Sequence, residues 1–324
     1  MLDFVREAFG WDAEAAVTEG PRGALGRIWR LDVGADRFAL KEIFAEPPSE
    51  AKIAAELAFA RRAAAAGVRL PASHADRTGR YLLTTPEGTW LRLYDWVDLE
   101  PTDRTSPATA RAVGALLARL HRCAPPATTE PDGAAPDRWY DSVPAAGAWA
   151  AATASGAAWA PLLAERVATL PELCAAVTPV DPARLLLCHR DLHPENVLAG
   201  PAGELVVVDW DNLGPAEPGR ELARALFDWC GDAPADLGGM AAMYGQYLRD
   251  GGPGRIAGAA DFTMLFAGSL NFLLVQARVA LDPGAEPAHR KWAEREIDES
   301  LHLLPAPGQL AEVLALAENL GREA

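Results

Sequence analysis

Closely spaced cysteines are missing from the sequence. Of the four cysteines, Cys123, Cys174, Cys188 and Cys230, no two form a C-x-x-C pair, which argues against a zinc site. Three of them lie among apolar residues, as free buried thiols usually do. Unpaired thiols fit a reducing compartment, so we expect a cytoplasmic protein.

Signals for export or membrane insertion are also missing. The N-terminal stretch MLDFVREAFGWDAEA has no positive region followed by a long apolar run, as a signal peptide would have. No uncharged apolar run reaches the ~18 residues of a membrane span. The alanine-rich stretch 145–160 comes nearest, but glycines, Thr153 and Ser155 interrupt it. We therefore expect no membrane contact.

Positive charge is in short supply. The 324 residues include 30 Lys and Arg against 45 Asp and Glu, so the net charge is −15. A nucleic-acid partner needs a basic surface, and we expect none. The negative field suits a cationic ligand, although solubility alone accounts for it equally well. Length and composition fit a globular enzyme.

Strand patterns dominate the first hundred residues. Residues 2–10 have helical spacing, and a second helix is expected from Ser49, a suitable N-cap, to Ala66. Gly34 to Asp36 predicts a tight hairpin. We expect residues 1–97 to form a small antiparallel lobe of five strands and one main helix. The five predicted strands lie near 14–19, 25–33, 37–44, 80–85 and 90–96.

Helical patterns dominate the remainder, residues 98–324. A helix is expected near 107–123, followed by a long loop at 124–145 of the kind that often serves a substrate site. Apolar runs at 185–187 and 204–208 predict two short strands, and only helices are expected after 217. The fold class is therefore α+β with two lobes, which would place a cleft between them.

A dense polar motif lies between the two short strands. The segment from His189 to Asn196 is HRDLHPEN, with the spacing H-x-D-x₄-N. Asp191 can accept the proton of an attacking hydroxyl, and Asn196 can offer its amide oxygen to a magnesium ion. His189 can support the loop through hydrogen bonds to backbone. Asp209, thirteen residues after Asn196 and at the end of an apolar strand, is a second hard oxygen ligand.

A lysine follows a small residue on the third predicted strand. Ala39 and Lys41 fall on one face by strand alternation. The small side chain would leave room for an adenine ring while the ammonium reaches the phosphates of a nucleotide. Glu56, on the following helix, is expected to pair with Lys41 and orient it. Glu50 remains an alternative partner.

Together these motifs resemble the aminoglycoside phosphotransferase family, which is related to choline kinases. The resemblance implies a protein-kinase-like fold, ATP or GTP as donor and Mg²⁺ as cofactor. It implies a catalytic role for the loop of His189, Arg190 and Asp191, with Asn196 and Asp209 as the metal ligands. It further implies that Lys41, Glu56 and Ala39 contact the nucleotide. A hinge for adenine is implied at Tyr94, Asp95, Trp96 and Val97.

The sequence departs from this family at three points. Arg190 replaces the usual glycine between the His and the Asp, and Glu221 replaces a common aspartate. The loop at 20–26 holds Gly20, Gly23 and Gly26 without the G-x-G-x-x-G order, so Gly23 is the least secure phosphate contact.

Several polar and aromatic residues keep two interpretations. His193 suits a structural role or a substrate contact, and Asp211 suits a turn cap, a second metal or the substrate. Three tryptophans suit helix packing or a pocket lining. Five carboxylates suit a solvated helix face or a cation-binding patch. These are Trp139, Trp149 and Trp159, and Asp261, Glu294, Glu296, Asp298 and Glu299.

Three functions follow from these patterns. The leading hypothesis is transfer of the γ-phosphate of ATP or GTP to a hydroxyl of a small cationic antibiotic-like molecule, as in resistance to an aminoglycoside. The alternative is a metabolic kinase acting on an amino alcohol, a sugar or a nucleoside. A nucleotide-binding pseudokinase is disfavoured by intact Lys41, Asp191, Asn196 and Asp209. A protein kinase is disfavoured because no A-P-E segment follows Asp209.

Overall fold

The computed structural model describes residues 1–23, 26–44, 46–232 and 234–323. The chain folds into two compact units. Unit 1 comprises Met1–Pro101 and Val197–Asp211, and unit 2 comprises Thr102–Asn196 and Asn212–Ala324. The boundary expected near residue 97 differs from that of the structure mainly in segment 197–211, which belongs to unit 1 although it follows the HRDLHPEN motif in sequence.

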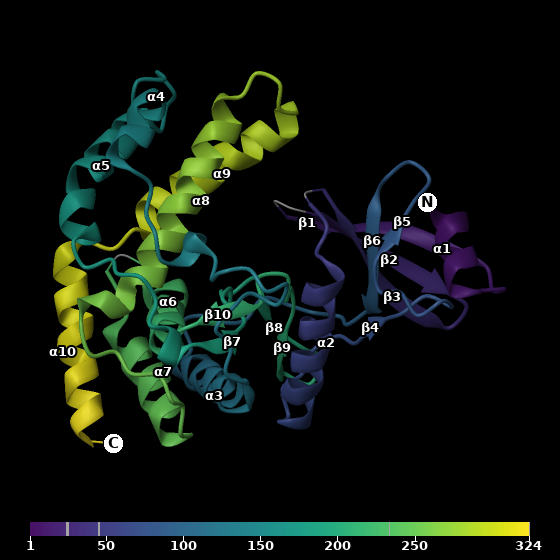
Figure 1. The fold of residues 1–324 in the computed structure, drawn as a ribbon, viewed down its shortest axis with the longest axis horizontal. Helices are drawn as coiled ribbons and strands as arrows, with labels where there is room; N and C mark the ends of the chain where they lie inside the picture. Colours follow the sequence, from purple (N-terminus) through teal and green to yellow (C-terminus); the bar gives the residue numbers. More distant parts are fainter. Residues whose placement is uncertain (24–25, 45, 233, 324) are drawn as a thin grey trace. The chain divides into compact units, whose positions relative to one another are not determined.

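An antiparallel sheet is the framework of unit 1 (Figure 1). Within the described residues it has six strands, in the order β1-β2-β3-β6-β4 with β5 also paired to β6. The predicted count of five is wrong because β4 has only two residues, too few to show alternation. Helices α1 and α2 accompany the sheet, at the positions where the helical spacing of residues 2–10 and the N-cap Ser49 predicted them. Their bounds are α1 Leu2–Phe9, β1 Ala15–Arg22, β2 Gly26–Val33, β3 Asp36–Ile43, α2 Glu50–Ala65, β4 Ser73–His74, β5 Leu83–Thr84 and β6 Trp90–Asp95.

The two faces of this sheet differ in chemistry because side chains alternate along each strand. Lys41 of β3 lies opposite Arg92 of β6, so both cations share one face. Arg92 is fully buried and contacts α2 through Glu56. The other face packs against α1 in an apolar core that includes Val5, Leu31, Leu40, Leu91 and Leu93.

A hairpin of β8 Val197–Ala199 and β9 Leu205–Val207 completes unit 1. Ala199 exchanges backbone hydrogen bonds of 2.8 and 3.0 Å with Glu100. The ring of Trp210 packs edge-on against Phe59 of α2, with ring centroids 5.7 Å apart. These contacts bind segment 197–211 to unit 1 and fix the start of the Asp209–Asp211 sequence.

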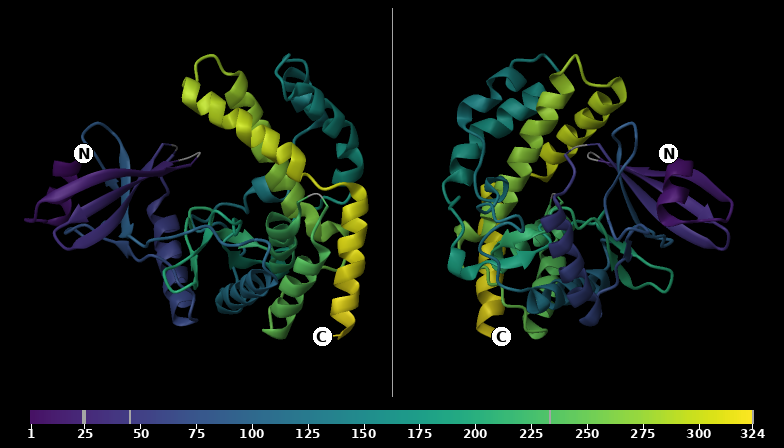
Figure 2. Two further views of the ribbon diagram at one scale, coloured as in Figure 1. Left: turned by 180° about the vertical axis from the view of Figure 1, so that it is seen from behind. Right: turned by 45° about the vertical axis from the view of Figure 1, so that its right-hand side comes forward.

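Unit 2 is mainly helical, as predicted. Helices α3 and α7 pack so closely that a Cβ on Gly114 would lie 2.1 Å from the carbonyl oxygen of Met243. Helices α8 and α9 run side by side in both views of Figure 2. The short strands β7 and β10 pair, and β10 was not expected because Gly-Pro-Ala carries no strand pattern. The bounds are α3 Pro107–Cys123, α4 Ala150–Thr153, α5 Ala160–Cys174, β7 Leu186–Cys188, β10 Gly214–Ala216, α6 Pro218–Cys230, α7 Leu237–Arg249, α8 Thr263–Leu281, α9 Pro287–Leu303 and α10 Pro307–Glu323.

The most apolar helical segment of the described residues is Ala259–Leu281, not the predicted stretch 145–160. It is long and apolar enough to cross a membrane by composition alone, but 56% of its apolar window is buried inside unit 2. Phe262 and Phe266 are fully buried there, as in the core helix of a globular protein. Trp149 and Trp159 are also buried, which supports their interpretation as packing residues.

Candidate active site

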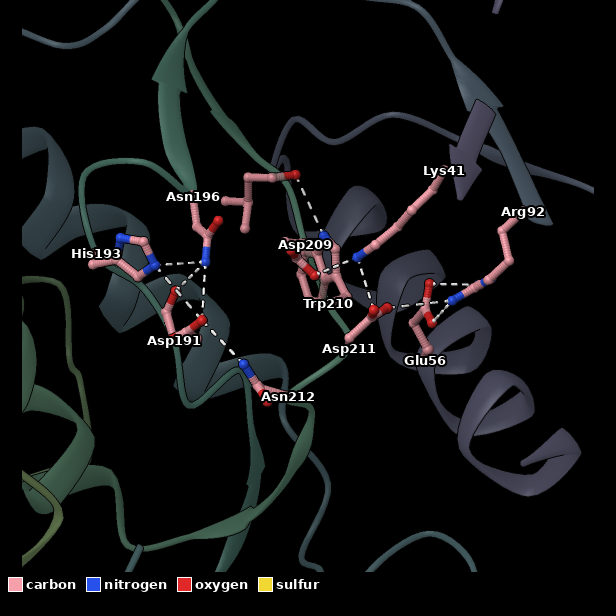
Figure 3. A network of polar contacts seen from close by, with 11 residues as sticks. Lys41, Glu56, Arg92, Asp191, His193, Asn196, Asp209, Trp210, Asp211 and Asn212 are labelled. Carbon is pink, nitrogen blue, oxygen red and sulfur yellow. Dashed lines mark hydrogen bonds and ion pairs between the residues drawn. The ribbon is translucent and has the colours of Figure 1, made fainter. Parts of the chain in front are cut away.

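The carboxylate of Asp191 lies at the centre of a polar cluster in unit 2 (Figure 3). Arg224 of α6 donates to its Oδ1 at 2.8 Å. Asn196 and Asn212 donate to its Oδ2 at 3.1 and 3.0 Å. With both oxygens held by donors from three chain positions, the carboxylate has one fixed orientation.

The charge state of Asp191 follows from these neighbours. Burial alone would raise the pKa of the Asp191 carboxyl. The interaction with His193, whose Nε2 lies 3.6 Å from Oδ2, and the charge of Arg224 outweigh burial and hold this pKa well below its ordinary value. Asp191 in turn raises the pKa of His193 despite the burial of the imidazole. The carboxylate is therefore ionised at neutral pH.

Helix α6 holds the backbone of the motif in place. Glu221 accepts a hydrogen bond from the N–H of Arg190, and Arg224 donates to the carbonyl of Arg190 at 2.7 Å. The indole of Trp229 donates to the carbonyl of Leu192 at 2.7 Å. Three side chains of one helix thus fix the residues on either side of Asp191.

A buried chain of hydrogen bonds supports Glu221. His121 of α3 contacts Glu221 through Nε2 at 2.6 Å and the hydroxyl of Tyr247 through Nδ1 at 2.8 Å. The hydroxyl of Tyr247 accepts the N–H of Gly254 at 2.7 Å. Burial would raise the pKa of Glu221, but His121 and the amide of Arg190 lower it. Glutamate therefore supports the loop here although the family commonly has aspartate.

The two other residues of the predicted catalytic triplet are both buried. His189 is 1% exposed and its charge contributes to the low pKa of Asp191. Arg190 has φ of +66°, a backbone conformation that favours glycine. Its guanidinium pairs with Glu130 at 2.7 Å rather than with Asp191. Arg190 is thus held by Glu130, and the catalytic role expected of His189 and Arg190 stays a prediction.

Asn196 is oriented by its amide nitrogen. This nitrogen donates to the backbone carbonyl and the carboxylate of Asp191 and lies 3.0 Å from Nε2 of His193. The amide oxygen lies on the opposite side of the group, and Figure 3 shows it pointing away from Asp191. An oxygen presented in this way can serve as a neutral ligand of a hard cation.

Lys41 forms the charged site of unit 1. Its ammonium donates to Asp209 at 2.8 Å and to Asp211 at 2.7 Å (Figure 3). Burial alone would lower the pKa of Lys41, but the two carboxylates raise it above its ordinary value. Asp211 is thus part of an ion-pair network, an arrangement that none of its three predicted roles included.

The predicted pairing of Lys41 with Glu56 is wrong. Both oxygens of Glu56 bind the guanidinium of Arg92, at 2.6 and 2.9 Å (Figure 3). The planar fork of arginine fits a carboxylate through two parallel bonds, whereas an ammonium acts as a point charge. Arg92 also lies 3.6 Å from Asp211. Glu50, the alternative partner, is exposed.

Asp209 combines a strained backbone with an accessible carboxylate. Its φ is +55°, and only it and Arg190 have positive φ among the non-glycine residues that the structure describes. Such strain concentrates at functional sites. The side chain of Asp209 is 43% exposed. The carboxylates of Asp209 and Asp211, both in unit 1, are hard oxygen donors, so the chemistry of this pair fits Mg²⁺.

The remaining predicted nucleotide residues lie in unit 1. Ala39 pairs with Tyr94 across β3 and β6 on the face that carries Lys41. Oδ1 of Asp95 lies 2.7 Å from Nε2 of His74, so its carboxylate takes part in a contact within the sheet. The indole of Trp96 donates to Asp98 at 2.8 Å, Val97 is partly exposed and Gly23 is exposed. Residues 24 and 25 of the predicted phosphate loop lie outside the described residues.

Two of the predicted acidic residues can be assigned. Asp261 accepts the backbone N–H groups of Ala257 and Gly258 and is buried, so it caps a helical turn. Glu296 of α9 has a pKa raised by partial burial and by the charges of Glu299 and Glu195. Glu296 and Glu299 of α9 and Glu195 of the HRDLHPEN motif therefore form a cluster of acidic residues within unit 2.

The sequence pattern did not single out Arg92, Asn212 or Arg224. Arg92 alternates with leucines and resembles a solvent-facing strand residue. Arg224 follows Glu221 at i+3, a spacing that places both on one helix face, and this was the available signal. Asn212 follows Asp211 directly, without any pattern that connects it to Asp191.

Comparisons with known proteins agree on one family and one fold. Residues 16–259 match the model of the phosphotransferase enzyme family, APH. The spectinomycin phosphotransferase APH(9)-Ia, solved with ADP and spectinomycin, has 12% identity and a TM-score of 0.67 over 95% of this chain and 97% of its own. No curated protein sequence matches this chain.

Two further solved structures share the fold. A microcompartment-associated aminopropanol kinase has 18% identity and a TM-score of 0.63 over 93% of this chain and 95% of its own. The amicoumacin kinase hAmiN, solved with AMP-PNP and Ca²⁺, has 15% identity and a TM-score of 0.60 over 94% and 93%. The predicted α+β kinase-like fold and family resemblance are thereby confirmed.

Proposed function

Because the chain belongs to the phosphotransferase enzyme family, we propose that it transfers the γ-phosphate of ATP or GTP to a hydroxyl of a small molecule. The observation that carries this proposal is the carboxylate of Asp191, ionised and fixed by Arg224, Asn196 and Asn212. A carboxylate held in this way can orient an acceptor hydroxyl and take its proton as the phosphoryl group moves.

The nucleotide would be bound by residues of unit 1. Lys41 is the proposed ligand of the α- and β-phosphates, beside Ala39 and the proposed hinge at 94–97. Asp209 and Asn196 are the proposed ligands of Mg²⁺, which would offset negative charge on the phosphates when bound. In this scheme the ammonium of Lys41 would give up part of its contact with Asp209 and Asp211 and bind phosphate oxygens instead. The phosphate oxygens are negatively charged, as the two carboxylates are.

The acceptor is proposed to be a hydroxylated cation. The net charge of −15 and the acidic residues Glu195, Glu296 and Glu299 support a positively charged molecule. Two solved relatives act, by name, on spectinomycin and on aminopropanol, so both an antibiotic and a metabolic amino alcohol belong in the test. Release of nucleoside diphosphate, compared with each acceptor and with none, distinguishes them.

Replacing the proposed base tests the mechanism. We expect Asp191→Ala to lower turnover by about a thousandfold or more, in the range for loss of a general base, while nucleotide affinity measured by calorimetry stays nearly unchanged. Asp232→Ala, which removes an exposed aspartate of the same unit, should retain wild-type turnover. Near-normal turnover in Asp191→Ala would overturn the assignment of the base.

A further inference from the structure

The guanidinium of Arg190 joins three segments of unit 2. It binds Glu130 through Nη1 and Nη2, at 2.7 and 3.2 Å, and donates from Nε to the carbonyl of Asn212 at 2.6 Å. Its Cζ lies 4.4 Å from the ring centroid of Tyr140. Arg190 and Glu130 are each 5% exposed. The side chain next to the proposed base is therefore buried against a loop that precedes it by about sixty residues.

The backbone conformation of Arg190 is unusual for a residue with a long side chain. A φ of +66° suits glycine and disfavours a residue with a Cβ. Gly214 faces the guanidinium, and a Cβ there would lie 2.2 Å from Cζ of Arg190. Position 190 thus has a backbone suited to glycine but carries arginine, and position 214, which lies against the guanidinium, is a glycine. This arrangement favours a specific function of the Arg190 side chain over mere tolerance of it.

Glu130 passes the connection on to the rest of the loop at 124–145. Its Oε1 accepts the N–H of Asp137 at 3.0 Å, and Asp137 caps the short helical turn Arg138–Tyr140. The other end of this turn is held by Asn271 of α8, which donates to the carbonyls of Trp139 and Ser142 at 3.0 and 2.8 Å. The loop is held at several points, which include backbone hydrogen bonds between 125–127 and 185–187, and one of these points is the residue beside Asp191.

We propose that Arg190 is a positioning residue that fastens the 124–145 loop to the catalytic motif, so that this loop forms a fixed wall of the acceptor site. The inference rests on the proposed kinase function. Arg190 contacts neither Asp191 nor the acceptor in this scheme. It acts through Glu130, and its loss should weaken acceptor binding without weakening nucleotide binding.

Hydrogen exchange tests the tether without any need for an acceptor. Arg190→Gly keeps the N–H that bonds to Glu221 and suits the positive φ, while Glu130→Gln keeps the shape of the side chain. We expect both variants to exchange amides in 124–145 about tenfold faster than wild type, as for a locally opened segment. Thr128→Ala truncates an exposed side chain of the same loop and should leave exchange unchanged. Unchanged exchange in folded Arg190→Gly or Glu130→Gln would overturn the tether.

Steady-state kinetics test whether the contact of Arg190 with Glu130 affects acceptor binding. Spectinomycin and aminopropanol serve as probes, and the better one is used to measure both KM values. In Arg190→Gly we expect the KM for this acceptor to rise about tenfold, with the KM for the nucleotide within about twofold of wild type. Equal changes in both KM values, or no change in either, would contradict a role in acceptor positioning. If wild type phosphorylates neither probe nor other hydroxylated amines, the proposed function fails, whereas hydrogen exchange still decides the tether.

Discussion

Five charged side chains of unit 1 form one network on the face of the sheet opposite the apolar core. Two cations on neighbouring strands, Lys41 and Arg92, would repel each other if they were alone. Three carboxylates lie among them, so the network carries one net negative charge. Arg92 is fully buried and needs a partner with two oxygens, which leaves Lys41 to the carboxylates that follow β9. The three carboxylates are Glu56, Asp209 and Asp211.

Removing one member of the buried pair tests this division of roles. Glu56→Gln leaves Arg92 with Asp211 as its nearest carboxylate, at 3.6 Å. We expect the free energy of unfolding to fall by about 3–5 kcal/mol, as when one partner of a buried ion pair is lost. Urea denaturation measures this change.

The matched control is Glu50→Gln on the same helix, where the side chain is exposed. It should change stability by less than about 0.5 kcal/mol. If Glu56→Gln left stability intact and instead abolished nucleotide binding, a pair of Lys41 and Glu56 would regain support over the pair of Arg92 and Glu56.

At the scale of single residues, spacing along the chain identified the motif but not its partners. Lys41, Asp191, Asn196 and Asp209 stand out because their types and intervals match a phosphate-transfer site. Arg92 and Arg224 could not be found in this way, because a partner for a buried charge is chosen by three-dimensional proximity. Glu56 shows the limit most clearly: its helix could be inferred, but the sequence does not show that Arg92, and not Lys41, binds its carboxylate.

At the scale of elements, short strands and turns limit the prediction. The helix expected near 107–123 is α3, Pro107–Cys123, because a long segment with helical spacing of its apolar residues is readily recognised. Strands β4 and β10 have only two and three residues, too few for a periodic pattern, and they form only because a partner strand is present. Helix α6 shows the converse: helical structure was expected after 217, but the role of this helix in holding residues 190–192 is not evident from the sequence.

One turn of unit 1 makes stability depend on pH. Burial alone would raise the pKa of Asp76, but donors from Thr78 and Arg80 lower it from 3.8 to about 2. A depressed pKa means that the carboxylate stabilises the folded state above pH 3.8 and that this contribution is lost as pH falls toward 2. We expect the free energy of unfolding of Asp76→Asn to be about 2 kcal/mol below that of wild type at pH 7. The two proteins should have the same free energy of unfolding near pH 2.

Asp103→Asn is the control for this turn. Asp103 accepts the N–H and hydroxyl of Thr105 in the same way but is exposed, so its replacement should alter stability little at any pH. Urea midpoints at several pH values give both comparisons. A constant difference between Asp76→Asn and wild type down to pH 2 would show that the carboxylate charge is not responsible.

At the scale of the whole molecule, the excess of acidic residues acts on the rate of encounter with a ligand. A net charge of −15 attracts cations over distances comparable to the Debye length, and salt screens this attraction. The proposed nucleotide, itself an anion, would gain nothing from this field and would depend on local cations such as Lys41. The acidic surface would therefore favour the proposed cationic acceptor over the proposed nucleotide donor.

Salt dependence tests this distinction. We expect kcat/KM for aminopropanol, a cationic amino alcohol, to fall several-fold, by roughly three to ten times, between low and about 0.5 M salt. A neutral hydroxylated acceptor such as glycerol serves as the control and should change little. Parallel losses for both acceptors would mean that salt acts on the enzyme or the nucleotide and not on acceptor attraction.

The return of segment 197–211 to unit 1 has a consequence for protein synthesis. The chain must leave its first folding unit at Pro101 and supply the last two strands of that unit almost a hundred residues later. During translation, the sheet can form early, but the ammonium of Lys41 meets its carboxylates only once residue 211 has left the ribosome. A fragment ending at Pro101 would therefore hold the cation of the site without the aspartates. Replacing unit 2 by that of a related protein requires three junctions in the chain instead of one.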